Sequence, residues 1–197
     1  MKPVVLASQS QSRAALLSAA GVIFTKISSG VDEDAVKQRM LAGGAGPKAI
    51  AEALGEAKAV AVSKRAPGLV IGADQTLDLD GELFDKADSI DEARTRLTAL
   101  RGRSHQLHGG LTVAEGGEVI WRHTESSTLV VRDFSDAFLE AYLARHGQEV
   151  LSSVGCYHYE GAGAQLFERT EGDYFAILGL PLLPLLAFLR TRDALQS

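Results

Sequence analysis

The segment 69-LVIGADQTLDLDGELFDK-86 decides the fold class that we predict for this chain. Its first part, Leu69 to Ala73, is a short apolar run typical of a buried strand, and the run ends at Asp74. Asp80-Gly81 then has the composition of a two-residue hairpin turn, which joins Leu77–Leu79 to Glu82–Phe84. The segment therefore predicts a buried strand followed by an antiparallel hairpin.

Strand and helix patterns alternate before this segment. Val4 to Ala7 is a candidate for a short buried strand, and a helix from about Arg13 to Ala20 ends at Gly21. From Pro47 to Lys64 the periodicity is helical. The apolar positions that we expect on one face of this helix are Ile50, Leu54, Ala57 and Ala61.

Hairpins and helices follow the segment. The capping box Ser89-Ile90-Asp91-Glu92 begins a helix that ends near Gly102. Strands are expected at Gln106–Val113 and Val119–Val131, joined by the turn at Gly116-Gly117. The remaining expected elements are a helix from Ser135 to Gly147, loops with short strands over 155–179, and a helix from about Pro181 to Leu195. We therefore predict an α/β fold in which helices flank a mixed β-sheet, within one domain over residues 1–197.

The composition of the 197 residues is that of a folded protein, with 46% hydrophobic and 23% charged residues. A net charge of −5 disfavours long nucleic acid and anionic membranes as partners, since both repel acidic surfaces. Cys156 is the only cysteine, which excludes an intramolecular disulfide and suits a reducing cytoplasm. The longest apolar stretch, Leu178 to Leu189, contains two prolines and is too short to span a bilayer, so we expect a cytoplasmic protein.

The first candidate for chemistry is the polar loop from Ser8 to Ser12, between the first strand and the first helix. Free backbone N–H groups at a helix start attract phosphate, and the hydroxyls of Ser8 and Ser10 add donors. Arg13 supplies a forked cation that suits phosphate oxygens. In the alternative interpretation the serines only cap the helix and Arg13 is solvated.

Two acidic segments form the second candidate. Asp74 follows an apolar strand, where open α/β sheets bind ligands, and it could hold Mg²⁺ or orient water; the alternative is a carboxylate that only forms a turn. In Val31-Asp32-Glu33-Asp34, one carboxylate could join Asp74, because Mg²⁺ takes one or two carboxylates together with phosphates. Equally, this cluster could be only the negative first turn of a helix that runs to Met40.

Two lysines and an aromatic region complete the candidates. Lys58 lies at the edge of the apolar stripe of its helix, where it either snorkels or reaches into a cleft. Lys86 follows the hairpin and could lie with Asp74 at the opening of one cleft, although a lone loop lysine is usually solvated. Aromatic rings in 155–161 and 171–174 could stack on a base, or they could fill the core.

Taken in order, these segments resemble the Maf family of nucleoside triphosphate pyrophosphatases nearly end to end. The opening Leu6-Ala7-Ser8-Gln9-Ser10, with Arg13 and Leu16-Leu17 after it, resembles the family's first signature. The other matching segments are Val31-Asp32-Glu33, Ala57-Lys58-Ala59, Gly72-Ala73-Asp74, Lys86, Glu171-Gly172-Asp173-Tyr174 and Gly179-Leu180-Pro181-Leu182. Several ordered matches are more specific than any single one.

The resemblance implies two lobes around a cleft, similar to inosine triphosphatase. It also implies hydrolysis of nucleoside triphosphates to monophosphate and pyrophosphate, by attack of water at the α-phosphorus with Mg²⁺ or Mn²⁺. The roles that it assigns are a general base for Asp74, assistance with the metal for Glu33, phosphate binding for Arg13, Lys58 and the catalytic Lys86, and loop contacts for Ser8 and Ser10. A homodimer is a further expectation from the family.

Base specificity in this family is determined at three positions, which are Ser12, Gln75 and Glu160 here. Gln75 and Glu160, together with Phe167-Glu168-Arg169, resemble the branch that acts on 7-methyl-GTP. The pyrimidine-preferring branch typically has Thr at the position of Gln75 and Gln at the position of Glu160. Ser12 matches neither branch. Three further departures from the family pattern are Gln11, Asp85 and Ala87, and they bear on loop conformation and substrate more than on the reaction class.

Two other functions fit the same residues. The chain could be a non-catalytic nucleotide-binding regulator of septum formation, although such a protein need not keep Glu33, Asp74 and Lys86. It could also be a phosphatase that releases orthophosphate. Analysis of the products formed in the presence of a metal distinguishes all three.

Overall fold

A seven-stranded mixed sheet forms the centre of the computed structural model, which describes residues 1–196. The strands are β1 (Val4–Leu6), β2 (Thr25–Lys26), β3 (Leu69–Leu79), β4 (Glu82–Phe84), β5 (Ser104–Glu115), β6 (Glu118–Val131) and β7 (Phe167–Glu171). Their order is β2-β1-β3-β5-β6-β7, with β4 paired to β3. β1 is parallel to both of its neighbours, and all other pairs are antiparallel. The predicted mixed sheet is confirmed.

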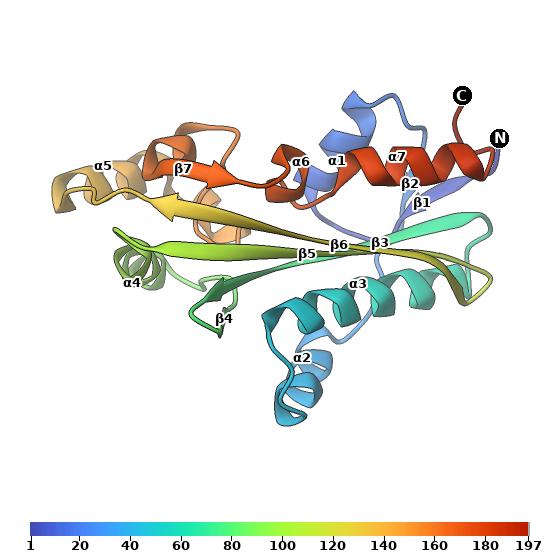
Figure 1. Ribbon diagram of the computed structural model, residues 1–197, viewed down its shortest axis with the longest axis horizontal. Helices are drawn as coiled ribbons and strands as arrows, with labels where there is room; N and C mark the ends of the chain where they lie inside the picture. The colour runs from blue at the N-terminus through green and yellow to red at the C-terminus, as the bar shows by residue number, and fades with distance from the viewer. Residues whose placement is uncertain (197) are drawn as a thin grey trace.

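Helices cover both faces of this sheet (Figure 1). They are α1 (Gln11–Ala19), α2 (Glu33–Ala42), α3 (Pro47–Ser63), α4 (Ile90–Leu100), α5 (Asp136–His146), α6 (Tyr174–Ile177) and α7 (Leu182–Thr191), with 3₁₀ turns at Gly147–Ser152 and Ala162–Leu166. In Figure 1, α1, α6 and α7 lie above the sheet, and α2 and α3 lie below it. The helices α4 and α5 lie at the left-hand end of the long strands. No helix in residues 1–196 combines the length and the apolar character that a membrane crossing requires.

Two large apolar cores lie at opposite ends of the long strands. The first packs α1 and α7 on β1 and on the start of β3, and it includes Leu17, Ile71 and Leu185. The second packs α4 and α5 on the end of β3 and on β5, around Leu97 and Phe134. The predicted two lobes correspond to these two cores.

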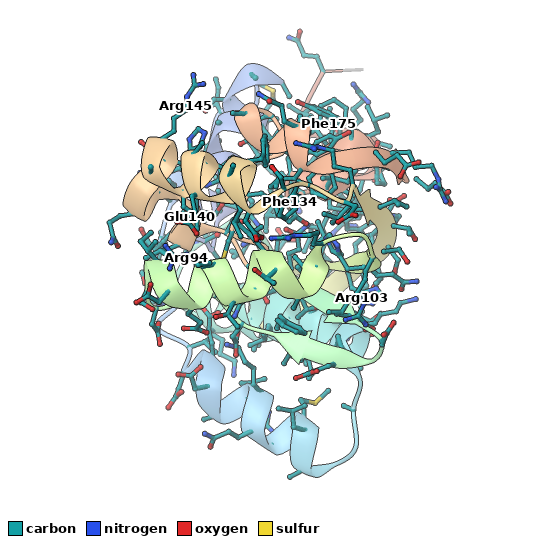
Figure 2. All side chains as sticks on the ribbon, turned by 90° about the vertical axis from the view of Figure 1, so that its left-hand side faces the viewer. Arg94, Arg103, Phe134, Glu140, Arg145 and Phe175 are labelled. Carbon is teal, nitrogen blue, oxygen red and sulfur yellow. The ribbon has the colours of Figure 1, made fainter. Side chains whose placement is uncertain are left out.

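The helices α4 and α5 are also joined at their surface (Figure 2). The guanidinium of Arg94 donates two hydrogen bonds to the carboxylate of Glu140, at 2.6 and 3.1 Å. Behind this pair, Phe134 is fully buried, and the guanidinium of Arg101 lies 4.9 Å from the centre of its ring. The second core is therefore packed with apolar side chains and is covered at its surface by the Arg94–Glu140 ion pair.

Local sequence signals place most helix boundaries correctly. The hydroxyls of Ser89 and Ser135 accept hydrogen bonds from the backbone N–H groups three residues later, as expected of helix caps. In the expected capping box, Glu92 accepts from the N–H of Asp88 rather than from that of Ser89. The hairpin turn at Asp80-Gly81 is confirmed, with both residues at positive φ.

Three expectations were wrong. β3 does not end at Asp74 but runs to Leu79, because its central residues pair with β5 throughout. The buried face of α3 is only partly the one expected, since Ile50 and Leu54 are fully buried, but Ala57 and Ala61 are half-buried and Lys58 is buried. The closing helix ends at Thr191 rather than near Leu195. The short strand β2 was not anticipated.

Glycines allow α3 to lie directly against the sheet. A Cβ at Gly72 of β3 would stand 2.3 Å from the carbonyl oxygen of Gly55, and one at Gly110 of β5 would stand 2.3 Å from that of Ala51. Real side chains do not approach this closely, so glycine is required where helix and strand backbones touch. Gly110 pairs with Asp74 across the ladder, and the contact therefore lies directly beside that carboxylate.

We predict that Gly110→Ala lowers the free energy of unfolding by about 2 kcal/mol, because the added methyl group forces α3 away from the sheet. The matched control is Gly109→Ala on the same strand, where a Cβ would meet no atom closer than 3.9 Å. Urea unfolding curves should show a lower midpoint for Gly110→Ala and a nearly unchanged one for Gly109→Ala. Equal midpoints for the two variants would contradict the close packing of α3 against β5.

Candidate active site

A single ammonium group joins two carboxylates from different elements. The Nζ atom of Lys58, on α3, lies 2.6 Å from Oδ1 of Asp74 on β3 and 2.8 Å from Oε2 of Glu33 on α2. The side chains of Lys58 and Asp74 are 7% and 13% exposed, whereas that of Glu33 is 42% exposed. These three residues, which we call the ion cluster, form a charged site that is closed on the side of the sheet and open on the side of α2.

The chain geometry explains why these groups meet. Asp74 lies two residues after Gly72 and so points to the same face of β3, the face that α3 contacts. Lys58 lies one helical turn after Gly55, on the side of α3 that faces the sheet. The glycine contact therefore brings the lysine and the aspartate to hydrogen-bond distance.

The acidic segment has two functions at once. The carboxylate of Asp32 caps α2 by accepting a hydrogen bond from the N–H of Ala35 at 3.0 Å. Glu33, in the first turn of α2, extends to Lys58 instead. The structure thus combines the two interpretations of this segment, since the helix start also delivers a carboxylate to the ion cluster.

Asp74 lies at a gap in one edge of β3. β1 pairs with residues 69–71 of β3 and β4 pairs with residues 77–79, so that residues 72–76 have only β5 beside them within the described chain. The loop after β1 begins at this gap, where the N–H of Ala7 donates to the carbonyl of Ile71 at 2.8 Å. A break of this kind, beside the carboxyl end of a parallel strand, is a usual place for a ligand in α/β proteins.

The loop after β1 carries the buried guanidinium of Arg13. Its Nε donates to the carbonyl oxygen of Gly179 at 2.9 Å, and its Nη1 donates to the hydroxyl of Ser8 at 3.2 Å. Ser10 caps α1 by accepting from the N–H of Arg13 at 3.3 Å. The serine cap is therefore real, but Arg13 is not solvated, because it is only 9% exposed.

Electrostatics connect Arg13 to the ion cluster. Burial lowers the pKa of the Arg13 guanidinium, and the negative charges of Asp74 and Glu33 partly offset this effect. The turn at Gly179 places Arg13 near Gln75, the residue after Asp74, since a Cβ at Gly179 would lie 3.5 Å from Nε of Arg13 and 3.8 Å from Oε1 of Gln75. Two cations and two carboxylates share one small region of the molecule.

The remaining predicted site residues are less directly placed. Gln75 lies beside the site, and its amide donates to the carbonyls of Ala176 and Ile177 in α6. Ser12, in the first turn of α1, is half-buried. Lys86 and Glu160 are exposed, and neither forms an ion pair with any residue of the described range 1–196. Their roles stay predictions.

Some contributing residues were not expected from the sequence. Gly55 and Gly110 allow the approach of α3, and Gly179 supplies the carbonyl that holds Arg13. Lys37, one turn after Glu33 on α2, lies 2.6 Å from Asp85, the residue before Lys86. The available signal was glycine inside a helical pattern and inside a strand pattern, which indicates close backbone contact.

Chemically, this arrangement suits an anion with several charges. Arg13 and Lys58 offer N–H donors to phosphate oxygens, and Asp74 and Glu33 offer oxygen ligands to a cation. Asp74 can also accept a proton from a water molecule. The same region could therefore bind a polyphosphate and assist its hydrolysis.

Comparison with known proteins gives a consistent result. Residues 3–192 match the family described as Maf-like protein. The nucleoside triphosphate pyrophosphatase of Caulobacter vibrioides is 58% identical over 99% of this chain and 98% of that protein. The 7-methyl-GTP pyrophosphatase of Brucella abortus is 47% identical over 98% of each chain. With a family match over nearly its whole length and relatives this similar, the chain belongs to the Maf family.

Proposed function

We propose that this protein hydrolyses nucleoside triphosphates to nucleoside monophosphate and pyrophosphate, by attack of water at the α-phosphorus with the help of a divalent metal. The observation that carries this proposal is the convergence of Asp74, Glu33 and Lys58 within hydrogen-bond distance, beside the buried Arg13. The names of the two relatives support the same reaction class.

The donor set of the ion cluster fits a divalent metal that is shared with a substrate. Asp74 and Glu33 already hold one cationic group between them, at 2.6 and 2.8 Å. Among residues 1–196 there is no cluster of three or more His, Cys, Asp or Glu side chains suited to a metal. Mg²⁺ typically takes only one or two carboxylates and fills its other positions with water and phosphate oxygens. When bound, Mg²⁺ or Mn²⁺ would supply positive charge to the phosphate oxygens.

The protein groups divide the remaining work. Asp74 acts as general base and takes a proton from the attacking water. Lys58 orients the Asp74 carboxylate through their 2.6 Å contact. Arg13, Lys58 and Lys86 balance the charge that grows on the leaving pyrophosphate, and Ser8 and Ser10 contribute to the phosphate-binding loop. Glu33 assists in holding the metal.

For the base, we propose a preference for methylated guanine nucleotides. Gln75 and Glu160 carry this proposal together with Phe167-Glu168-Arg169, and relatives named 7-methyl-GTP pyrophosphatase support it. Other relatives carry the broader name nucleoside triphosphate pyrophosphatase. Because Ser12 matches neither branch, we expect any difference in substrate to arise at that position. The homodimer, the cytoplasmic location and the single domain stay predictions.

Asp74→Asn should lower kcat for pyrophosphate release by about 10³-fold, because an amide cannot accept the proton from water. The matched control is Asp78→Asn, on the same strand, where the side-chain oxygen still caps the turn at Gly81. Thermal unfolding should show that both variants fold. Near-normal turnover in Asp74→Asn would reject the assignment of the general base.

Product analysis of the unaltered protein tests the reaction class itself. Canonical and modified triphosphates are incubated with Mg²⁺, and pyrophosphate and orthophosphate are measured separately. Pyrophosphate release supports the proposal. Release of orthophosphate alone would indicate a phosphatase, and nucleotide binding with no product would indicate the non-catalytic regulator.

Glu160→Gln should change the choice of base more than the rate. An amide at this exposed position presents a donor as well as an acceptor, whereas the carboxylate presents acceptors only. We expect the ratio of kcat/KM for 7-methyl-GTP over that for UTP to fall about tenfold, while the kcat for the preferred substrate changes little. An unchanged ratio would remove Glu160 from the base-binding region.

A further inference from the structure

The side chain of Gln75 is already used inside the protein. Its Nε2 lies 2.9 Å from the carbonyl oxygen of Ala176 and 3.2 Å from that of Ile177. Because both partners are acceptors, the amide must present its NH₂ group to them, and both of its donors are occupied. Gln75 therefore ties the short helix α6 to the residue next to Asp74.

The segment after α6 is held at the same place by a second bond. The carbonyl of Gly179 accepts from Nε of Arg13 at 2.9 Å in a buried contact. Gly179 has a φ of +97°, and a Cβ there would lie 3.5 Å from that Nε and 3.8 Å from Oε1 of Gln75. The turn after α6 therefore lies in contact with Arg13 and Gln75 together, so that α6 has a fixed position relative to the proposed phosphate site.

Tyr174 begins α6 and presents a large aromatic surface to solvent. It is 48% exposed, and its ring centre lies 6.1 Å from that of Tyr159 and 5.7 Å from that of Phe175. Asp173 caps the helix by accepting from the N–H of Ala176 at 2.8 Å, which fixes the first turn. Tyr159 directly precedes Glu160 in the sequence. The Tyr174 ring therefore lies next to the segment that carries Glu160, the residue proposed to choose among bases.

Tyr174 lies close to the contact between α6 and β3. It is three residues before Ile177, whose carbonyl accepts from Gln75, and this is about 4.5 Å along a helix axis. Figure 1 shows α6 on the face of the sheet that also carries α1, the helix that begins at the phosphate-binding loop. A ligand with its phosphates at Arg13 therefore binds beside the turn that follows α6, and the Tyr174 ring at the start of α6 lies against Tyr159, the residue before Glu160.

We propose that Tyr174 is the surface on which the nucleobase stacks, and that Gln75 is a positioning residue that holds this surface in place through α6. This inference rests on the proposed function. Stacking on an aromatic ring is available to every base, because every base has a π-face. Tyr174 thus supplies affinity for any nucleotide, while Glu160 supplies the choice among bases.

The test compares a nucleotide with inorganic tripolyphosphate, which has the same charged tail and no base. We expect Tyr174→Ala to raise the KM for GTP about tenfold, and to leave the inhibition constant of tripolyphosphate and the kcat unchanged. Tyr174→Phe should retain the unaltered KM, because the ring remains. Leu183→Ala, which removes a 60% exposed apolar side chain from α7, is the control and should change neither constant.

The role of Gln75 is tested by Gln75→Met, which keeps the length of the side chain and removes the donors. It should raise the KM for GTP in an otherwise unaltered protein, and it should add little in the Tyr174→Ala background, because it acts through that ring. Additive effects of the two substitutions would instead indicate that Gln75 contacts the base directly, and would overturn the positioning role.

Three results would overturn the stacking surface. These are an unchanged KM in Tyr174→Ala, an equal loss of affinity for GTP and for tripolyphosphate, and a change of oligomeric state in place of a change in nucleotide affinity. Failure of the proposed reaction is distinguishable, because it appears as the absence of pyrophosphate release by the unaltered protein. In that case, calorimetric titration with GTP and with tripolyphosphate still compares the two ligands in each variant.

Discussion

The contact between α3 and the two central strands is the constraint on which the site depends. Three glycines, Gly55, Gly72 and Gly110, let the helix backbone approach the sheet to a distance that any side chain would prevent. Lys58 and Asp74 project from the two surfaces next to this contact, and their 2.6 Å separation follows from it. A shift of the helix by the width of a methyl group would separate the pair, so that packing and chemistry are coupled at one place.

Charge balance gives Lys58 a central position. An ammonium group has three N–H donors; one donates to Asp74, and Glu33 is an ion-pair partner at 2.8 Å. A donor is left for a phosphate oxygen, so the same lysine can orient the general base Asp74 and bind the substrate. Loss of Lys58 would leave the nearly buried Asp74 carboxylate without its partner, which is costly because buried charges need compensation. Activity and stability should both depend on this residue.

Local patterns in the sequence predicted more than the long-range contacts did. The hairpin turn at Asp80-Gly81 and the serine caps were predicted because their chemistry is local. Beyond Asp74, the alternation of polar and apolar residues in Thr76 to Leu79 continues the strand, but aspartate is unfavourable in strands and suggested an end. Lys58 was assigned to an edge because a charge counts as polar in any periodicity, whereas its burial depends on partners from two other elements. Lys86 and Glu160 are exposed, so their contacts depend on the ligand rather than on the packing of the chain.

Side chains alternate between the two faces of β3, and this alternation places the contacts to the phosphate chain and the contacts to the base on opposite faces of the sheet. Gly72 and Asp74 point to the face covered by α3, where the ion cluster lies, while Gln75 points to the opposite face and holds α6. A ligand can reach both faces only where the sheet is interrupted, and residues 72–76 of β3 have no strand on their open edge within the described chain. Adjacent residues on one strand can thus serve the phosphate chain and the base separately. Substitution of α6 residues should therefore alter base recognition without disturbing the general base.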